Sequence, residues 1–291
     1  MKKRDKVPVL HRIEPYMWLA PSLILFGIFT FYPFITTFIK SFFILDTRGN
    51  YSQFVGLENY TKILGDETFL RAVKNTIFFV LMTVPVSKIL GFLLAILANK
   101  RRRFSSFYET AFSLPMAIAS SVIAMIFQLL YVPSLGLINT TFHLKIQWLN
   151  DPKTALLSIA FVQIWLSTGY AFMFLLSAVR SVPEEILESA DMDGAGPLRK
   201  MISFYLPLTS PTMFYLVCSD IAFMMMSMGL VNVLTKGGPQ NSTITIMYYV
   251  FRQFSGSGNY TMANPAAVIA FCMTFVVTGA SFLWERRGVH Y

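Results

Sequence analysis

The sequence predicts an all-α integral membrane protein with six transmembrane helices, and three observations lead to this fold class. Hydrophobic residues make up 55% of the 291 residues and charged residues 13%, about half of the roughly 25% found in soluble domains. The apolar residues gather in runs of about 20 or more, long enough to cross a hydrocarbon core about 30 Å thick. Lys and Arg cluster at the ends of these runs, where they orient a membrane protein. The net charge of +9 therefore does not indicate a nucleic-acid-binding face.

The first three spans follow from the apolar runs and their flanks. We expect the first at Met17–Phe38, where the run is too long and too aromatic for a cleaved signal peptide. The second span is expected at Thr76–Ala98 and the third at Phe107–Tyr131. They contain Pro85 and Pro115, each of which should kink its helix while neighbouring helices satisfy the freed carbonyl groups.

The last three spans are expected at Thr154–Ala178, Leu206–Leu234 and Ala266–Leu283. Because six is an even number, both termini lie on one side of the membrane. That side carries 14 Lys and Arg, including the cluster Lys100–Arg103, against 8 on the other, which predicts that both termini are cytoplasmic. The predicted organisation is a cytoplasmic tail at residues 1–16, a single transmembrane domain at 17–285 and a second cytoplasmic tail at 286–291.

The loop between the fourth and fifth spans, residues 183–205, is unusually acidic for a cytoplasmic face. Five of the chain's 15 acidic residues lie here: Glu184, Glu185, Glu188, Asp191 and Asp193. Pro183 and the two glutamates after it favour the start of a short helix, since carboxylates complement the positive end of the helix dipole. Gly194 and Gly196 interrupt that helix, and Pro197 can begin a second one. The loop therefore predicts a helix–turn–helix elbow.

Two ionisable residues are expected near mid-membrane depth, where charges are costly and functional by default. Lys88 lies at the centre of the second span and Asp220 at the centre of the fifth. Their similar depth and opposite sign suggest that they form an ion pair, which could be purely architectural. Alternatively, Lys88 faces a transport pathway and attracts an anionic substrate such as a sugar phosphate.

Uncharged polar and aromatic residues inside the spans are candidates for a substrate pathway, because they can bind hydroxyl groups without trapping them. Gln163, Ser167 and Tyr170 share one face of the fourth helix. Phe223 and Ser227 lie four residues apart in the fifth span. The alternative for each residue is a hydrogen bond to a neighbouring helix.

The elbow also carries a family resemblance. The run from Glu188 to Gly196, ESADMDGAG, followed by Phe204, Leu206-Pro207 and Pro211, resembles the EAA motif of binding-protein-dependent ABC importer permeases, with Ser189 in place of the usual alanine. The runs Phe54–Tyr60 and Gly237–Pro239 are similar to runs in the carbohydrate-uptake branch of that family. The chain as a whole resembles the first permease of glycerol-3-phosphate and oligosaccharide importers.

The resemblance implies roles for two groups of residues. In the elbow, which would dock on a cytoplasmic ATPase, Glu188 would be the anionic contact, Asp193 and Gly194 would shape the bend with Gly196 beside it, and Ala190 and Ala195 would pack against the ATPase. The positions that match the carbohydrate groove of the maltose branch are Ser120, Gln163, Leu166, Ser167, Tyr170, Phe223 and Ser227. Ser167 replaces a glycine of that branch, and Met224 and Ser227 replace asparagines, which argues against maltodextrin itself as the cargo.

The resemblance also implies partners and the absence of chemistry in this chain. We expect a second, similar permease, two copies of an ABC ATPase, an extracytoplasmic substrate-binding protein and membrane lipid, in a bacterial or archaeal cytoplasmic membrane, with a sugar, oligosaccharide or glycerol 3-phosphate as cargo. The chain itself is expected to be neither an enzyme nor a nucleic-acid binder, and to hold no cofactor or metal; ATP and Mg would bind to the partner. The sequence has no Gly-Lys-Ser/Thr phosphate loop and no HExxH motif. The alternatives are an ion-coupled secondary carrier that uses Asp220 and Lys88, and a membrane-embedded enzyme.

Overall fold

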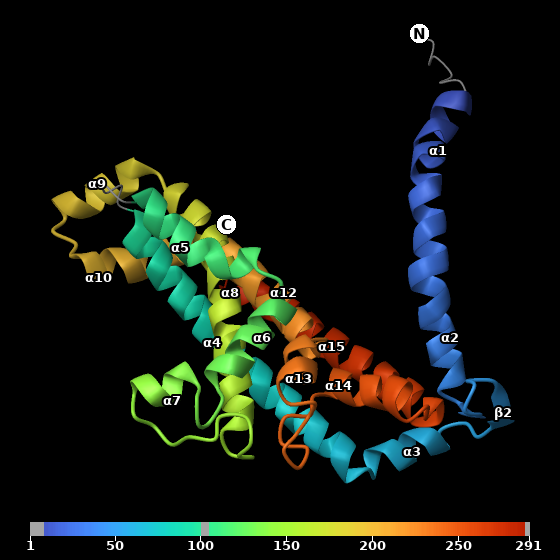
Figure 1. Cartoon of the computed structure of the whole chain (residues 1–291). Helices are drawn as coiled ribbons and strands as arrows, with labels where there is room; N and C mark the ends of the chain where they lie inside the picture. The colour runs from blue at the N-terminus through green and yellow to red at the C-terminus, as the bar shows by residue number, and fades with distance from the viewer. Residues whose placement is uncertain (1–8, 100–104, 289–291) are drawn as a thin grey trace, which may run out of the picture.

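A computed structural model describes residues 9–99 and 105–288 (Figure 1). The predicted cluster Lys100–Arg103, half of the first tail and half of the second lie outside the described residues. The helices are α1 Val9–Phe26, α2 Tyr32–Lys40, α3 Glu58–Leu64, α4 Glu67–Asn99, α5 Ser105–Ala117, α6 Ser120–Leu130, α7 Leu137–Thr141, α8 Ala155–Arg180, α9 Glu184–Met192, α10 Pro197–Lys200, α11 Leu206–Leu208, α12 Ser210–Met225, α13 Gly229–Leu234, α14 Ile246–Phe251 and α15 Tyr260–Gly288. Short π-helical segments are η1 Gly27–Phe31, η2 Met201–Tyr205 and η3 Arg252–Gly256.

The all-α membrane architecture predicted from the sequence is confirmed. In the described part of the chain, four helices are long and apolar enough to cross a membrane: Tyr16–Lys40, Glu67–Asn99, Ala155–Arg180 and Tyr260–Leu283. They correspond to the predicted first, second, fourth and sixth spans. The predicted third and fifth spans are each a bent pair of helices, so the count rises to six if each pair is one span.

The predicted third span is not continuous. It breaks after Ala117 into α5 and α6, whose axes differ by 97°. Pro115 lies inside α5 and cannot donate a backbone hydrogen bond, which weakens the last turn before the break. Ala119 is extended, with φ −60° and ψ 134°, and its carbonyl accepts the first bonds of α6. Local backbone geometry at Ala119 therefore turns the chain much more sharply than the kink expected from Pro115.

The predicted fifth span, Leu206–Leu234, also differs from the structure. Its helix bends by 69° at Thr209, where Pro211 has no N–H to donate to the preceding turn. The helix then ends at Met225 instead of Leu234, and α13 follows as a separate short helix that begins at Gly229 and packs beside α6. Glycine weakens a continuous helix by roughly 0.5–1 kcal/mol relative to alanine, which favours a break at this point.

A small antiparallel hairpin was not predicted. Strands β1, Phe43–Leu45, and β2, Tyr51–Phe54, follow the first span, with Phe43 opposite Phe54. Asn59, fully buried in α3, donates from Nδ2 to the carbonyls of Ser41 (3.0 Å) and Phe43 (2.9 Å). This contact ties the Phe54–Tyr60 motif to the end of α2.

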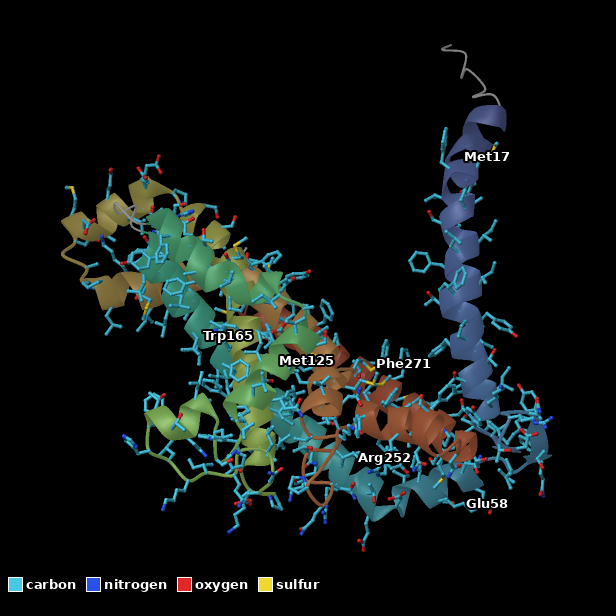
Figure 2. All side chains as sticks on the ribbon, viewed as in Figure 1. Met17, Glu58, Met125, Trp165, Arg252 and Phe271 are labelled. Atoms are coloured by element: carbon cyan, nitrogen blue, oxygen red, sulfur yellow. The ribbon has the colours of Figure 1, made fainter. Side chains whose placement is uncertain are left out.

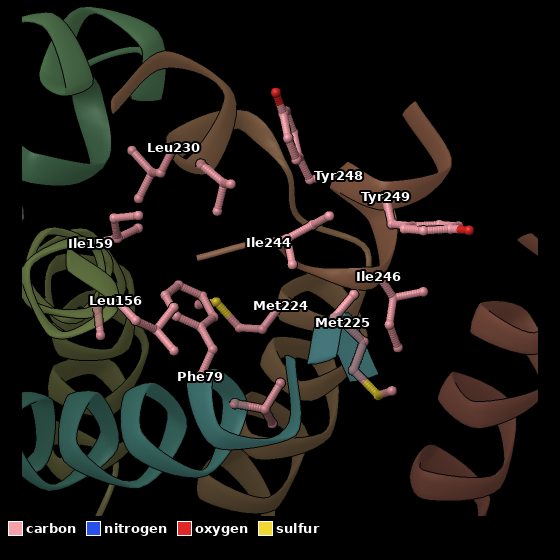
Figure 3. Packing of buried hydrophobic residues seen from close by; sticks show 14 of the residues in the cluster. Phe79, Leu156, Ile159, Met224, Met225, Leu230, Ile244, Ile246, Tyr248 and Tyr249 are labelled. Atoms are coloured by element: carbon pink, nitrogen blue, oxygen red, sulfur yellow. The ribbon is translucent and has the colours of Figure 1, made fainter. Parts of the chain in front are cut away.

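The helical body is built around the pair α4 and α8. Gly91 lets these two helices approach closely: a Cβ at position 91 would lie 2.6 Å from the Cβ of Ala171. A small residue at such a crossing is typical of membrane helix packing. Figure 3 shows the larger core cluster, which includes Phe79 and Met224 together with Ile244 and Ile246 from the segment before the sixth span.

The loop before the sixth span is part of this core. Ile246, Tyr249 and Val250 lie on a short helix, α14. Their side chains are buried, so this helix packs into the body of the protein. Tyr249 donates a hydrogen bond from its hydroxyl to Asp66 Oδ2, 2.8 Å away, and burial raises the pKa of this tyrosine to about 12.

The first helix stands apart from this body in Figure 1, and Figure 2 shows Met17 near its free end. In its most apolar 18 residues, 0% are buried. Trp18 is 80% exposed and Phe29 73%. The helix meets the body near its other end, where the rings of Phe34 and Phe271 lie 4.8 Å apart.

Candidate functional site

A cavity of about 610 Å³ lies between the bent helices and α8. All seven residues predicted for the substrate pathway line it: Ser120, Gln163, Leu166, Ser167, Tyr170, Phe223 and Ser227. The structure therefore brings them together from α6, α8, the end of α12 and the segment after it, although their role in transport remains a prediction. The lining also includes residues that the sequence argument did not propose: Pro115, Met116, Ile118, Ser219, Asp220, Met228, Gly229 and Leu230.

The two breaks in the predicted spans create one side of this cavity. The break at Ala119 exposes Ser120 at the first position of α6. After α12 ends at Met225, the chain places Gly229 near Ser120, and a Cβ on Gly229 would lie 3.9 Å from the Ser120 hydroxyl oxygen. Straight helices would not have placed these two segments against one cavity.

Helix α8 supplies the opposite wall. Gln163 and Ser167 are buried, and the Gln163 amide donates to the Ser167 hydroxyl at 3.1 Å. Tyr170 lies one turn further along the same face and is half-buried. Met224, by contrast, is one of the two residues that replace asparagines of the maltose branch. It is 1% exposed, belongs to the core and does not lie on the cavity wall.

Lys88 and Asp220 form the ion pair that the sequence suggested. Lys88 Nζ of α4 contacts Asp220 Oδ2 of α12 and ties these two helices together. Lys88 is 3% exposed and does not line the cavity, so the alternative that it faces the pathway and attracts an anionic substrate is wrong. Asp220 does line the cavity, and among the described lining residues it is the one charged side chain.

The predicted elbow forms from α9, a tight turn and the helical segment Pro197–Leu208. Gly194 has φ +71°, a left-handed conformation that disfavours residues with a Cβ. The N–H of Gly194 bonds to the carbonyl of Asp191 (3.0 Å), and the N–H of Ala195 bonds to that of Ala190 (2.9 Å). This pair of bonds is the Schellman motif, which ends a helix and satisfies its last carbonyl groups. Lys200 also forms an ion pair with Asp191 across the turn.

This geometry corrects one prediction for the elbow. Ala190 is 2% exposed and Ala195 8%, because they are the two positions that come together in the motif. They are buried inside this chain, so the prediction that they pack against an ATPase is wrong. Glu188, Asp193, Gly194 and Gly196 are exposed.

Two exposed apolar residues beside the bend were missed by the sequence argument. Met192 is 90% exposed and Leu198 65% exposed, one on each arm of the elbow. The available signal was their position: each is an apolar residue within four positions of the turn glycines, in an otherwise acidic and polar loop. Exposed apolar side chains next to an exposed carboxylate are typical of a protein contact surface.

Bent apolar helices around a cavity that has polar side chains in its wall, with an exposed elbow beyond them, define a polytopic membrane transport protein. Comparison with known families makes the assignment specific. The chain belongs to the family of binding-protein-dependent transport system inner membrane components, which it matches over residues 88–286. That range holds every residue of the elbow and of the cavity lining.

The relatives agree with this membership over nearly the whole chain. The chain is 31% identical over 287 residues to the sn-glycerol-3-phosphate transport system permease protein UgpA of Agrobacterium fabrum, covering 97% of each. Two crystal structures share the fold. One is a bacterial ABC transporter that imports the acidic polysaccharide alginate, with TM-score 0.85, 22% identity and coverage of 96% of this chain and 97% of that one. The other is a bacterial alginate ABC transporter in complex with its alginate-bound periplasmic protein, with TM-score 0.83, 21% identity and 96% of both chains covered. The ion-coupled carrier alternative receives no support.

Proposed function

We propose that this chain is one of two permease subunits of an ATP-driven importer and forms half of the path for a sugar, an oligosaccharide or glycerol 3-phosphate. The observation that carries the proposal is the cavity, because polar and aromatic side chains suited to hydroxylated cargo meet there from α6, α8, α12 and the segment that follows α12. The aromatic rings of Tyr170 and Phe223 can stack on the apolar faces of a sugar, and serine and glutamine side chains can exchange hydrogen bonds with its hydroxyls. Cargo of this kind agrees with the named cargo of the relative and of the structural neighbours.

Energy would come from a separate ATPase that binds ATP and Mg and docks on the elbow. Glu188 offers an exposed carboxylate, and Met192 and Leu198 offer apolar contacts on either side of the bend. A rigid connection supports this role, since the Schellman turn and the Lys200–Asp191 pair fix the angle between the two arms. Movement of the ATPase would then be passed along Pro197–Leu208 to α12 at the cavity. This chain would carry out no covalent chemistry.

A second permease would cover the first helix. The apolar side chains of Tyr16–Lys40 point outward on all sides of the helix (Figure 2). A single neighbouring surface of this chain could not bury all of them. Lipid can cover part of this surface. A helix that projects so far from its own body is well placed to pack on another subunit, and the cavity would then be closed from the side by the partner's helices.

The ends of the molecule support an orientation in a bacterial or archaeal cytoplasmic membrane. The described chain ends and the elbow lie toward one end of the molecule in Figure 1, and the hairpin, α3 and α7 lie toward the other. With the elbow facing the ATPase, both termini would be cytoplasmic. The hairpin end would then receive an extracytoplasmic binding protein, as the alginate transporter does in complex with its periplasmic protein.

Co-purification from native membranes tests the proposal. Tagged chain in mild detergent should bring along an ABC ATPase and a second permease. Glu188→Lys should release the ATPase while the second permease stays. Glu58→Lys makes the same charge change at an exposed site at the hairpin end and should release neither. A chain that arrives alone, or one that keeps its ATPase in the Glu188→Lys variant, would contradict the proposal.

A further inference from the structure

We infer that Asp220 is the specificity-determining residue of the cavity: its carboxylate accepts hydrogen bonds from the hydroxyls of an uncharged sugar or oligosaccharide and disfavours phosphorylated or carboxylated cargo. The inference rests on the proposed function, because it takes the cavity to be the cargo path. It narrows the cargo to one chemical class.

The first step is the position of Asp220. It lies in α12, one turn before Phe223, and Ser227 follows just after the end of that helix; all three residues line the cavity. It is 7% exposed, so its small exposed area is turned to the cavity and not to open solvent or lipid. A cargo that contacts Phe223 and Ser227 therefore comes within reach of this carboxylate.

The second step is the role of Lys88, which lies behind the carboxylate. A lone carboxylate at this depth would be neutralised by protonation, because isolated charge is costly inside a membrane. Lys88 Nζ balances that charge from the α4 side and uses Oδ2. Oδ1 is left as the oxygen that can accept from a hydroxyl in the cavity. The ion pair thus presents its negative end to the cavity and keeps its positive end out of it.

The third step is the chemistry of the remaining wall. The described lining residues include no Lys, Arg or His, the side chains that recognise phosphate and carboxylate groups. The start of α6 at Ser120 contributes a partial positive charge of about half an electron, which is weaker than the full charge of a carboxylate. Serine hydroxyls and the Gln163 amide both donate and accept, as sugar hydroxyls do. Of the cargo proposed above, sugars and oligosaccharides fit this wall and glycerol 3-phosphate does not.

The electrostatic part can be measured with charged thiol reagents. Both native cysteines, Cys218 and Cys272, are replaced by alanine, and Ser227→Cys provides a probe on the cavity wall. The complete complex is then treated with a trimethylammonium-ethyl methanethiosulfonate and, separately, with a sulfonato-ethyl methanethiosulfonate of similar size. At Ser227→Cys we expect the ratio of the reaction rate of the cationic reagent to that of the anionic reagent to be severalfold higher than the same ratio for a free thiol in solution. Asp220→Asn should abolish this preference. Ser257→Cys, on an exposed loop outside the cavity, is the matched control and should not respond to Asp220→Asn.

Several results would overturn the inference. An equal or faster reaction with the anionic reagent at Ser227→Cys would mean that the wall attracts anions. A preference that survives Asp220→Asn would assign it to another group. If Asp220→Asn fails to fold because Lys88 is left unpaired, Asp220→Asn with Lys88→Met removes both charges and answers the same question. A probe that reacts with neither reagent, at Ser227→Cys or at Ser120→Cys, would show that this wall is not open to cargo.

A transport assay distinguishes failure of this inference from failure of the proposed function. In vesicles with ATP, the complete complex is offered labelled maltotriose and labelled glycerol 3-phosphate together with its native binding protein. ATP-driven uptake of glycerol 3-phosphate would retain the importer and overturn the role of Asp220. Loss of the ATPase from the purified complex would instead overturn the importer, whatever the thiol reagents report.

Discussion

The turn at Gly194 offers the sharpest test of how the elbow works. Gly194 has φ +71°, whereas Gly196, two residues later, has φ −66° and ψ 168°, which any residue can adopt. Among the described residues, no atom lies within 4 Å of a Cβ placed at either position. Serine at both positions is therefore a matched pair of substitutions that differ only in backbone conformation.

The expected magnitude follows from that difference. A residue with a Cβ in the left-handed conformation costs about 1–2 kcal/mol, and at Gly194 no steric clash adds to it. Gly194→Ser should therefore favour opening of the turn by a factor of about 5–30. At position 196, serine sits at the start of α10 and is a better N-cap than glycine, so Gly196→Ser should be neutral or slightly stabilising.

Hydrogen exchange measures this opening directly. The amide of Ala195, bonded to the carbonyl of Ala190, should exchange about 5–30 times faster in Gly194→Ser than in the unchanged chain, and no faster in Gly196→Ser. ATPase co-purification should fall in the first variant only. Equal exchange in the two variants would refute the reasoning, because the argument depends on the conformation of Gly194 alone.

Three further predictions follow from the packing and the buried charges. Gly91→Ala should destabilise the protein by about 1–3 kcal/mol through overpacking. Gly279→Ala should be neutral or stabilising, because no described atom lies near a Cβ at that position. Unfolding in mixed micelles measures the stability of both variants. Lys88→Met should cost about 3–5 kcal/mol because it leaves Asp220 buried without its partner, and Lys88→Asp with Asp220→Lys should recover part of that stability in the same assay. If the double variant is no more stable than the single one, the pair does not contribute as argued. The neutral form of Tyr249 is favoured by folding, so its contribution is complete below about pH 10 and declines as the pH rises toward 12; thermal unfolding of Tyr249→Phe should lack this alkaline decline.

Several features were predictable because their causes are local in the chain. The membrane class and the helices that contain Thr76–Ala98 and Thr154–Ala178 follow from hydropathy, which sums contributions from neighbouring residues. The elbow follows from Gly194 and Pro197, whose backbone preferences act within a few residues. Helical spacing also put Gln163, Ser167 and Tyr170 on one face, and the resemblance to the maltose branch supplied the full set of seven residues that the structure brings to one cavity.

Other features could not be read from the chain. The sharp turn at Ala119 and the end of α12 at Met225 lie inside runs of high hydropathy, and Pro115 and Gly229 mark only where a helix is weakened, not how the chain turns there. The hairpin strands have only three and four residues, too few for an alternating pattern to be recognised. The burial of Ala190 and Ala195 depends on how the turn closes, not on their size or polarity.

Lys88 and Asp220 show which properties follow from the sequence alone and which depend on the tertiary structure. The sequence determined that Lys88 and Asp220 lie at similar depth with opposite sign, because depth follows from position within an apolar run. Only the tertiary structure decided that Asp220 faces the cavity and Lys88 lies behind it. In a span that is apolar on every side, no face is marked as inward by its own residues. The rotation of the helix is set by the surfaces of the helices packed against it, and those come from distant parts of the chain.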